Sequence, residues 1–473
     1  LPPTLPAKLV RGPGLPNSPL EGMILMQQDL ISGSVPKRLF RFAAPLFLAN
    51  LLQSCYSLVD MAVVGRFVGS AGLAAAASSA QIVSVITSLC LGLSTGGTVL
   101  VSQYRGAKRT EEERAASGTL CAFSLLLSLV LAAALPFLCG PVFQFMSVPV
   151  QVMPLALEYL RILSPGLLFS FGYNALCAIL RGQGDSAGPL KFVAGSTLLN
   201  IALDLLLTGI LGLGMAGAAL ATVAAQAFSC LLAVLYLLRR GFFREVRRKH
   251  FRLRGASLGR LLRLGLPTAA QMTVLNLSYL LVTGMFNACG VAEAAAAGVG
   301  LNLNTYAAMP CWAVGQAVTA MTGQNLGAKK PDRARRTALT GLWLSALLCA
   351  VPVSAVQLFT PQIVFCFNRD PAVIAAGVRY LRICCGLNFL PYSCMYLLDS
   401  FATGAGDSLF AMGNALFQSV VVRLSLSALF TYVLGWGFSG LCWAEFLSPL
   451  LPCLLGAAYF LSGVWQKKNR IST

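Results

Sequence analysis

The chain has 473 residues, of which 57% are apolar and only 11% are charged, and its mean hydropathy is +0.74. A soluble domain carries about 25% charged residues, so this composition excludes an ordinary soluble protein and indicates a membrane protein. The formal net charge is +19. Because most Lys and Arg lie near the N-terminus, in alternate loops and at the C-terminus, the charge favours membrane topology over a nucleic-acid surface.

Twelve apolar stretches have the length of about 20 residues that crosses a bilayer. Twelve crossings put the basic loops and both termini on one side, and the positive-inside rule makes that side cytoplasmic. The sequence therefore predicts an all-α, multi-pass membrane protein. In chain order, the predicted spans are 39–64, 76–102, 115–139, 155–180, 189–210, 215–239, 262–288, 294–323, 337–357, 373–402, 411–433 and 439–463.

The predicted spans form two groups of six. Residues 1–22 are Pro-rich and polar, and Met23 resembles a natural start, so the fold prediction leaves this stretch aside as upstream sequence. The predicted units are an N-terminal tail (1–35), an N-lobe (36–239), a basic cytoplasmic linker (240–259), a C-lobe (260–466) and a C-terminal tail (467–473).

The second half repeats motifs of the first at a nearly constant offset. Gln103-Tyr-Arg-Gly-Ala-Lys is answered 221 residues later by Gln324-Asn-Leu-Gly-Ala-Lys, and Tyr159-Leu-Arg-Ile recurs from Tyr380. Gly182-Gln-Gly-Asp-Ser returns 222 residues later as Gly404-Ala-Gly-Asp-Ser. Duplicated bundles that meet at a central interface are common in secondary transporters, which makes transport the leading hypothesis.

Proline occupies matching places early in each half. Pro45 and Pro267 both lie in the first span of their half, where proline removes a backbone hydrogen bond and favours a kink. Pro165, Pro310 and Pro391 predict further breaks. A bend of this kind is either static packing or a moving joint, and a joint is the preferred interpretation for Pro45.

Other motifs suggest chemistry that their context does not support. The two GxGxxG stretches, 212–217 and 435–440, sit between spans and predict tight turns rather than nucleotide sites. The sequence has no GxxxxGK[ST] loop, and its fifteen Cys lack zinc spacing or a CxxC pair. The single histidine, His250, has no ligand-spaced partners. We therefore expect no enzymatic activity, no catalytic residue and no bound cofactor apart from a coupling ion.

Acidic residues inside hydrocarbon are costly, and they usually face a cavity or a partner. Asp60 lies toward the outer end of the first span, and Asp204 lies in the fifth, one turn after Asn200. Thr222 has a comparable depth in the sixth span. No Lys or Arg lies in the middle of a first-half span, so we expect one pocket that holds a shared proton or a sodium ion. The alternative is a hydrogen-bonded packing cluster.

The second half carries a different pair at the corresponding spacing. Arg423 and Glu445 are 22 residues apart, as are Asn200 and Thr222. A base and an acid in these places predict an internal ion pair, with Asp399 as a candidate third member. Because a compensated pair needs no proton to be neutral, its expected role is structural or gating.

The order of these motifs resembles the multidrug and toxic compound extrusion (MATE) transporters over about residues 36–463. The resemblance implies a V-shaped antiporter of twelve helices in the bacterial inner (plasma) membrane, with two six-helix lobes and a central cavity. Its members export cationic or amphiphilic compounds against inward proton or sodium flow. The segments that carry the resemblance are Pro45, 50–53, 59–60, 65–66, 103–108 and 180–185 in the first half, and 309–310, 323–328 and 404–407 in the second.

The resemblance also implies site residues. The first-helix aspartate of the family falls on Asp60, and the N-lobe network of proton-linked members falls on Tyr159, Asn174, Asn200, Asp204 and Thr222. Some sodium-linked members carry an acidic residue in the seventh helix, and this residue is absent from 262–288. Its absence favours an ion site in the N-lobe over one in the C-lobe. If the coupling ion is sodium, we expect it to bind at Asp60 and Asp204. The residues expected to line the substrate cavity are Gln53, Gln81, Asn302 and Gln316.

The expected partners are a small-molecule substrate, foremost an amphiphilic cation, and the lipid bilayer, with no nucleic acid; we expect a monomer. A lipid-linked saccharide flippase of the same superfamily is the first alternative, but it calls for a cationic cavity, and only Arg423 lies deep in a span. A channel or a non-transporting membrane protein is the second. A channel does not require two alternating lobes, and a receptor usually adds a soluble domain.

Overall fold

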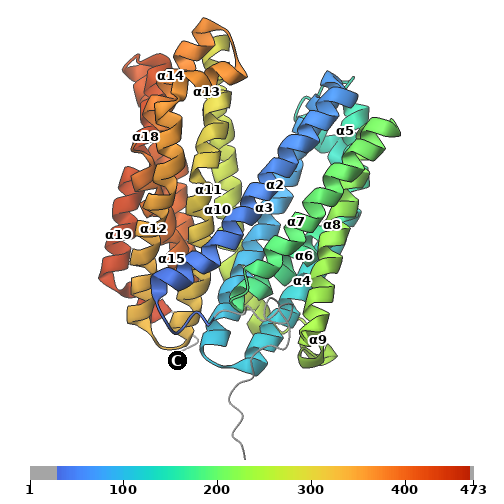
Figure 1. Ribbon diagram of the computed structural model, residues 1–473, viewed down its shortest axis with the longest axis vertical. Coiled ribbons are helices and arrows are strands. Elements are labelled where there is room, and N and C mark those ends of the chain that lie inside the picture. The colour runs from blue at the N-terminus through green and yellow to red at the C-terminus, as the bar shows by residue number, and fades with distance from the viewer. Residues whose placement is uncertain (1–28, 469–473) are drawn as a thin grey trace, which may run out of the picture.

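The computed structural model describes residues 29–468, which contain helices and no strand. Two helix bundles meet at one end of the molecule and diverge toward the other, so the molecule has the shape of a V (Figure 1). This confirms the all-α prediction. The first bundle consists of α2 (Val35–Phe67), α3 (Ser70–Gly106), α4 (Thr110–Phe145), α5 (Met153–Leu163), α6 (Gly166–Gly182), α7 (Ala187–Leu203), the π-helix η1 (Asp204–Ile210) and α8 (Gly214–Arg239).

The linker carries two short helices, α9 (Phe242–Glu245) and η2 (Arg248–His250), and the second bundle follows it. Its first helix begins at Gly255, so the last residues of the predicted linker are helical. The second bundle consists of α10 (Gly255–Asn287), α11 (Val291–Gly327), α12 (Pro331–Leu358), α13 (Thr360–Phe367), α14 (Pro371–Cys384), α15 (Phe389–Ala405), α16 (Ser408–Leu416), η3 (Phe417–Val422), α17 (Arg423–Ala428), η4 (Leu429–Val433), α18 (Gly437–Leu447), α19 (Leu450–Ser462) and η5 (Val464–Lys468).

Nine helices in the described part of the chain are long and apolar enough to span a membrane. The number of candidate spans rises to eleven if each of two bent helix pairs counts as one span. The pairs α5–α6 and α14–α15 bend by 50° and 53°. The 37-residue helix α11 is long enough to be a further span, but the predicted number of twelve stays a prediction. The short helix α13 was not predicted.

The prolines differ in what they do to their helices. Pro165 lies at the α5–α6 bend, as expected of a helix breaker. Pro310 lies inside the continuous helix α11, so the break predicted there is wrong. Helices α2 and α10 also continue through Pro45 and Pro267. An interior proline can be accommodated in a membrane helix when neighbouring helices pack against it.

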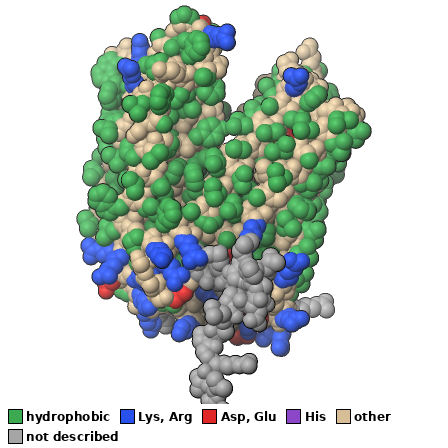
Figure 2. Space-filling view, viewed as in Figure 1, with side chains coloured by type: hydrophobic (Ala, Val, Ile, Leu, Met, Phe, Trp, Pro, Cys, Tyr) green, Lys and Arg blue, Asp and Glu red, His purple; other side chains and the backbone are tan. Residues whose placement is uncertain are grey.

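The two ends of the molecule differ in their content of Lys and Arg side chains. Lys and Arg gather where the bundles meet, which we call the basic end, whereas a cleft separates the bundles at the opposite, open end (Figure 2). Apolar side chains cover the bundle sides between the two ends. On α4, Leu125, Leu126, Leu129 and Val130 are 47–56% exposed. A continuous apolar surface of this kind is expected for a protein whose sides face lipid.

The first helix of each bundle packs with one part in the hydrophobic core of the N-lobe and with the other part in that of the C-lobe. The early part of α2, including Leu39 and Leu46, packs among α11, α12 and α15 of the C-lobe, whereas Val64 near its end packs in the N-lobe core. Helix α10 does the reverse: Leu261 belongs to an N-lobe core cluster, and Phe286 belongs to a C-lobe one. Each helix therefore begins in the opposite lobe and ends in its own lobe. Its proline lies in the early part, which packs against the opposite lobe.

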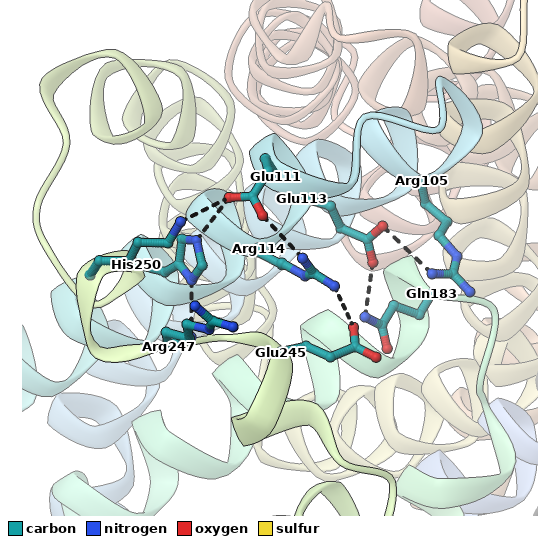
Figure 3. A network of polar contacts seen from close by, with 9 residues as sticks. Arg105, Glu111, Glu113, Arg114, Gln183, Glu245, Arg247 and His250 are labelled. Carbon is teal, nitrogen blue, oxygen red and sulfur yellow. Dashed lines mark hydrogen bonds and ion pairs between the residues drawn. The ribbon is translucent and has the colours of Figure 1, made fainter.

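The segments that enter these two helices are also held by the opposite lobe. Arg333 of α12 donates to the backbone oxygens of Gly33 and Ser32, both at 2.7 Å, just before α2 begins. The linker before α10 is held by α4, where His250 Nε2 lies 3.1 Å from Glu111 Oε2 (Figure 3). His250 Nδ1 accepts from the Arg247 backbone N–H, so its Nε2 carries the proton and donates to Glu111. This explains why His250 is buried without being a metal ligand.

Candidate functional site

Four of the predicted N-lobe residues converge from four helices. Asp60 lies on α2, Tyr159 on α5, Asp204 at the start of η1 and Thr222 on α8. Asp60 is close enough to Asp204 for their charges to interact, and both carboxylates act on the Tyr159 hydroxyl, which lies beside Thr222. Asn200 is one helical turn before Asp204 on α7. We call these five residues the acidic cluster.

The polar atoms of the acidic cluster are buried but poorly satisfied by protein partners. Asp204 is 0% exposed and Asn200 is 1% exposed. Among the described residues, neither carboxylate oxygen of Asp204, neither amide atom of Asn200 and one oxygen of Asp60 finds a hydrogen-bond partner. Buried polar side-chain atoms in native proteins are usually hydrogen-bonded. A bound proton, ion or water would supply the partners that these atoms lack.

No basic side chain compensates the two carboxylates. The ion pairs within residues 29–468 lie at the basic end or between Arg423 and Glu445, and none includes Asp60 or Asp204. Two negative charges in a buried site repel each other and attract any cation that reaches them. The expected chemistry of the acidic cluster is thus the capture of a proton or a metal cation.

Asp204 stands where the helix changes geometry. Residues before it form the α-helix α7, and Asp204 opens the seven-residue π-helix η1. Short π-helical segments are rare and frequently occur at functional sites. The wider turn places Asp204 and Thr208 in the buried interior, and the Thr208 hydroxyl also lacks a hydrogen-bond partner among the described residues.

Two members of this neighbourhood were not predicted. The Tyr56 hydroxyl interacts with the charges of Asp60 and Asp204 and lies near Thr222. Tyr56 precedes Asp60 by four residues, and Thr208 follows Asp204 by four, so each shares a helix face with a predicted residue. That spacing was the sequence signal for both.

Asn174 does not join the acidic cluster in the described structure. It lies on α6, beyond the bend that follows α5, and its Nδ2 donates to the Ser170 backbone oxygen at 2.9 Å. This contact stays within α6, and no hydrogen bond of the described residues links Asn174 to Asp204. Its place in the network of Asp204 stays a prediction.

The predicted C-lobe ion pair is present. Arg423 Nε lies 3.0 Å from Glu445 Oε2, the two side chains are 2% and 4% exposed, and the guanidinium lies over the Tyr279 ring at 4.3 Å. Asp399 is not its third member. It accepts a 2.8 Å hydrogen bond from Asn414 Nδ2 instead, because its position on α15 directs it toward α16 rather than toward Arg423.

The four residues predicted to line the substrate cavity lie in different surroundings. Gln53, Gln81 and Asn302 are exposed, and Gln316 is half-buried. Asn302 lines a cavity of about 290 Å³ inside the C-lobe, together with Arg423 and Glu445. No contact places the other three in that cavity.

The repeated motifs meet where the lobes touch at the basic end. Gln103 of α3 donates to the Gly404 oxygen at 3.1 Å, and Gln324 of α11 donates to the Gly182 oxygen at 2.8 Å. Each glutamine thus bonds the GxGDS motif of the opposite lobe. A Cβ at Gly327 would lie 2.1 Å from the Gln103 oxygen, so only glycine lets α3 and α11 approach this closely. We call these contacts the glutamine lock.

Comparison with known proteins agrees with the internal repeat. A family model described as MatE matches residues 45–206 and again residues 267–429. The probable multidrug resistance protein YoeA of Bacillus subtilis is 29% identical over 452 residues, which cover 94% of this chain and 97% of that protein. The probable multidrug resistance protein NorM of Thermotoga maritima is 24% identical, with coverage of 92% and 94%.

Solved structures share the fold. An outward-facing conformation of a multidrug resistance MATE family transporter superposes with a TM-score of 0.88 at 21% identity, covering 93% of this chain and 99% of that one. A MATE structure in complex with MaL6 gives a TM-score of 0.89 at 20% identity, with the same coverage.

Proposed function

This chain belongs to the MatE family of multidrug and toxic compound extrusion transporters, and we propose that it exports amphiphilic or cationic small molecules by cation-coupled antiport. The observation that carries the proposal is the uncompensated carboxylate pair of Asp60 and Asp204. A buried site with two negative charges and neutral oxygens around them accepts either protons or a sodium ion. No enzymatic step is part of the proposal.

We assign the basic end to the cytoplasm, because positively charged loops remain on that side of the membrane. The form described here is then open to the outside and closed to the inside. We expect the protein to work as a monomer. Because the relatives named above are bacterial, the membrane would be a bacterial plasma membrane. Both described ends of the chain lie at the basic end (Figure 1).

The coupling step begins when a cation enters the acidic cluster from the open end. Neutralising Asp60 and Asp204 removes their repulsion and supplies hydrogen-bond partners for oxygens that lack them. Helix α2 is thereby drawn toward η1 and α7, against which it packs. The change narrows the N-lobe side of the cleft and lowers its affinity for a bound cationic substrate.

Helix α2 can pass this movement to the other lobe. Its late part carries Asp60, while its early part, from Val35 to Leu46, is embedded in the C-lobe core. Pro45 lies at the end of the embedded part, where the missing backbone hydrogen bond leaves the helix easier to bend. A bend there would shift one lobe relative to the other.

Alternating access also requires the basic end to open. The glutamine lock is the closure that must break, since its two hydrogen bonds join the lobes directly. Because the glutamine lock closes the basic end, the structure argues against a continuously open channel. The buried Arg423 is already paired with Glu445, which argues against the cationic cavity that a flippase for lipid-linked pyrophosphates would need.

Transport in proteoliposomes tests the proposal. Purified protein would be reconstituted with ethidium, an aromatic cation, and ethidium movement followed by fluorescence under an imposed proton gradient and then a sodium gradient. Asp60→Asn should abolish gradient-driven movement, whereas Glu112→Gln, which removes an exposed carboxylate at the basic end, should leave it intact. Equal transport by wild type and Asp60→Asn would refute the coupling scheme.

A further inference from the structure

The C-lobe contains a second polar cavity, distinct from the acidic cluster. Its volume is about 290 Å³, and it lies between α10, α11, the α14–α15 bend, α17 and α18. Its charged residues are Arg423 and Glu445, and its aromatic lining includes Tyr279 and Trp312. The volume is close to the lower limit of about 300 Å³ for small-molecule sites, so the cavity suits a compact ligand.

The cavity presents both a donor and an acceptor that protein groups leave unsatisfied. Arg423 Nε and Glu445 Oε2 form an ion pair at 3.0 Å, yet neither atom makes a well-aligned hydrogen bond, and Arg423 Nη1 also has no hydrogen-bond partner among the described residues. Asn388 Oδ1, on the same cavity wall, lacks one too. Both side chains are more than nine-tenths buried. Unsatisfied buried groups of this kind are costly, and a ligand that carries both an acceptor and a donor group would satisfy them.

The charges of the cavity further limit the ligand. Arg423 and Glu445 cancel each other, so adding a lone anion or cation would leave a net charge in a buried site, which is costly. A zwitterion keeps the total at zero. The two protein charges are 3.0 Å apart, which is about the separation of the ammonium and carboxylate of an α-amino acid.

Aromatic rings complete the site. The Tyr279 ring supports the Arg423 guanidinium from one side. The Trp312 indole is held in place by a 3.0 Å hydrogen bond from its Nε1 to the Tyr392 hydroxyl, so its ring orientation is fixed. Rings held in this way offer flat apolar surfaces on which a ligand ring can pack in offset or edge-on geometry.

We propose that this cavity binds a small aromatic zwitterion of the α-amino-acid type. Its carboxylate accepts from Arg423 Nη1, its ammonium donates to Glu445 and Asn388 Oδ1, and its ring packs against Tyr279 and Trp312. The inference deepens the proposed function, on which it rests for the claim that such a ligand is exported. It assigns the C-lobe to zwitterions and leaves the N-lobe acidic cluster to the coupling cation.

Binding of radiolabelled L-tryptophan to the purified full-length protein tests this assignment. Tryptamine lacks the carboxylate and indole-3-propionate lacks the ammonium, so each forfeits one charge-assisted hydrogen bond. Both should compete about ten- to one-hundred-fold more weakly than unlabelled tryptophan. Absence of tryptophan binding, or equal competition by all three compounds, would overturn the assignment.

The variant for this test removes both charges together. Arg423→Gln combined with Glu445→Gln leaves no lone buried charge, so the fold should tolerate it better than either single change. Tryptophan binding should fall to the level of tryptamine, while Glu112→Gln, which changes an exposed carboxylate outside both sites, should bind tryptophan normally. Unchanged binding in a folded double variant would contradict the site. If the wild-type protein exports ethidium but does not bind tryptophan, this inference alone is rejected. If it binds tryptophan but shows no cation-driven export, the proposed function is rejected.

Discussion

Breaking the glutamine lock should release the basic end of the molecule. The perturbation is Gln103→Ala combined with Gln324→Ala, which removes the two hydrogen bonds from one lobe to the backbone of the other. Both glutamines are 4% exposed, so in the closed form the carbonyls of Gly404 and Gly182 would lose their partners without gaining water. When the basic end opens, water can reach them.

The magnitude follows from the two lost bonds. A net contribution of about 0.5–1.5 kcal/mol for each hydrogen bond gives about 1–3 kcal/mol against the closed form. That free energy corresponds to a shift of about 5- to 150-fold in the equilibrium between closed and open basic ends. Gln103 and Gln324 lie at the same close crossing of α3 and α11, so the free-energy changes of the two single variants should not simply add.

Hydrogen–deuterium exchange measured by mass spectrometry reports this opening. Peptides covering the ends of α3 and α11, near Gly106 and Gly327, should exchange faster in the double variant than in wild type. Gln357→Ala is the matched control, because it removes a 2.7 Å glutamine-to-backbone bond that stays within the C-lobe. The reasoning fails if the double variant exchanges at these peptides like wild type, or no faster than the control.

Three further changes probe other parts of the account. Gly327→Ala should force the basic end apart and speed exchange there, whereas Gly298→Ala on the same helix meets no neighbour within 4 Å and should not; equal effects would argue against close packing. Glu445→Gln leaves Arg423 buried without its partner and should lower stability by about 3–5 kcal/mol in a denaturant titration; normal stability with lost ion dependence would reverse its assigned role. His250→Ala should free the linker from α4 and speed tryptic cleavage there, and an unchanged cleavage rate would show that the contact does not hold the linker.

The sequence was sufficient for the all-α membrane class and for the internal duplication, because hydrophobic stretches of membrane length and duplicated motifs are local signals. It also brought Asp60, Asp204, Asn200 and Thr222 together, since shared depth and helical spacing could be inferred from span boundaries. Arg423 and Glu445 were found through the repeat. In each case a one-dimensional pattern fixed the position of a residue along its helix.

The errors arose where rotation about a helix axis or a bend decided the outcome. Asp399 has the depth expected of a partner for Arg423 but faces Asn414 instead. Pro310 was expected to break its helix, but α11 continues through it. The repeated Gln103 and Gln324 were recognised as motifs, yet their contacts across the lobes depend on how α3 crosses α11, which no spacing in the sequence specifies.

The central claim is that Asp60 and Asp204 hold the cation that is exchanged for substrate. The most direct measurement is the release of bound protons or of bound radioactive sodium when ethidium is added to the purified protein. Wild type should release one of these cations as ethidium binds. The Asp60→Asn, Asp204→Asn double variant should release neither, even at the higher ethidium concentration that its lowered affinity requires for binding. Equal release from the double variant and from wild type would contradict the claim.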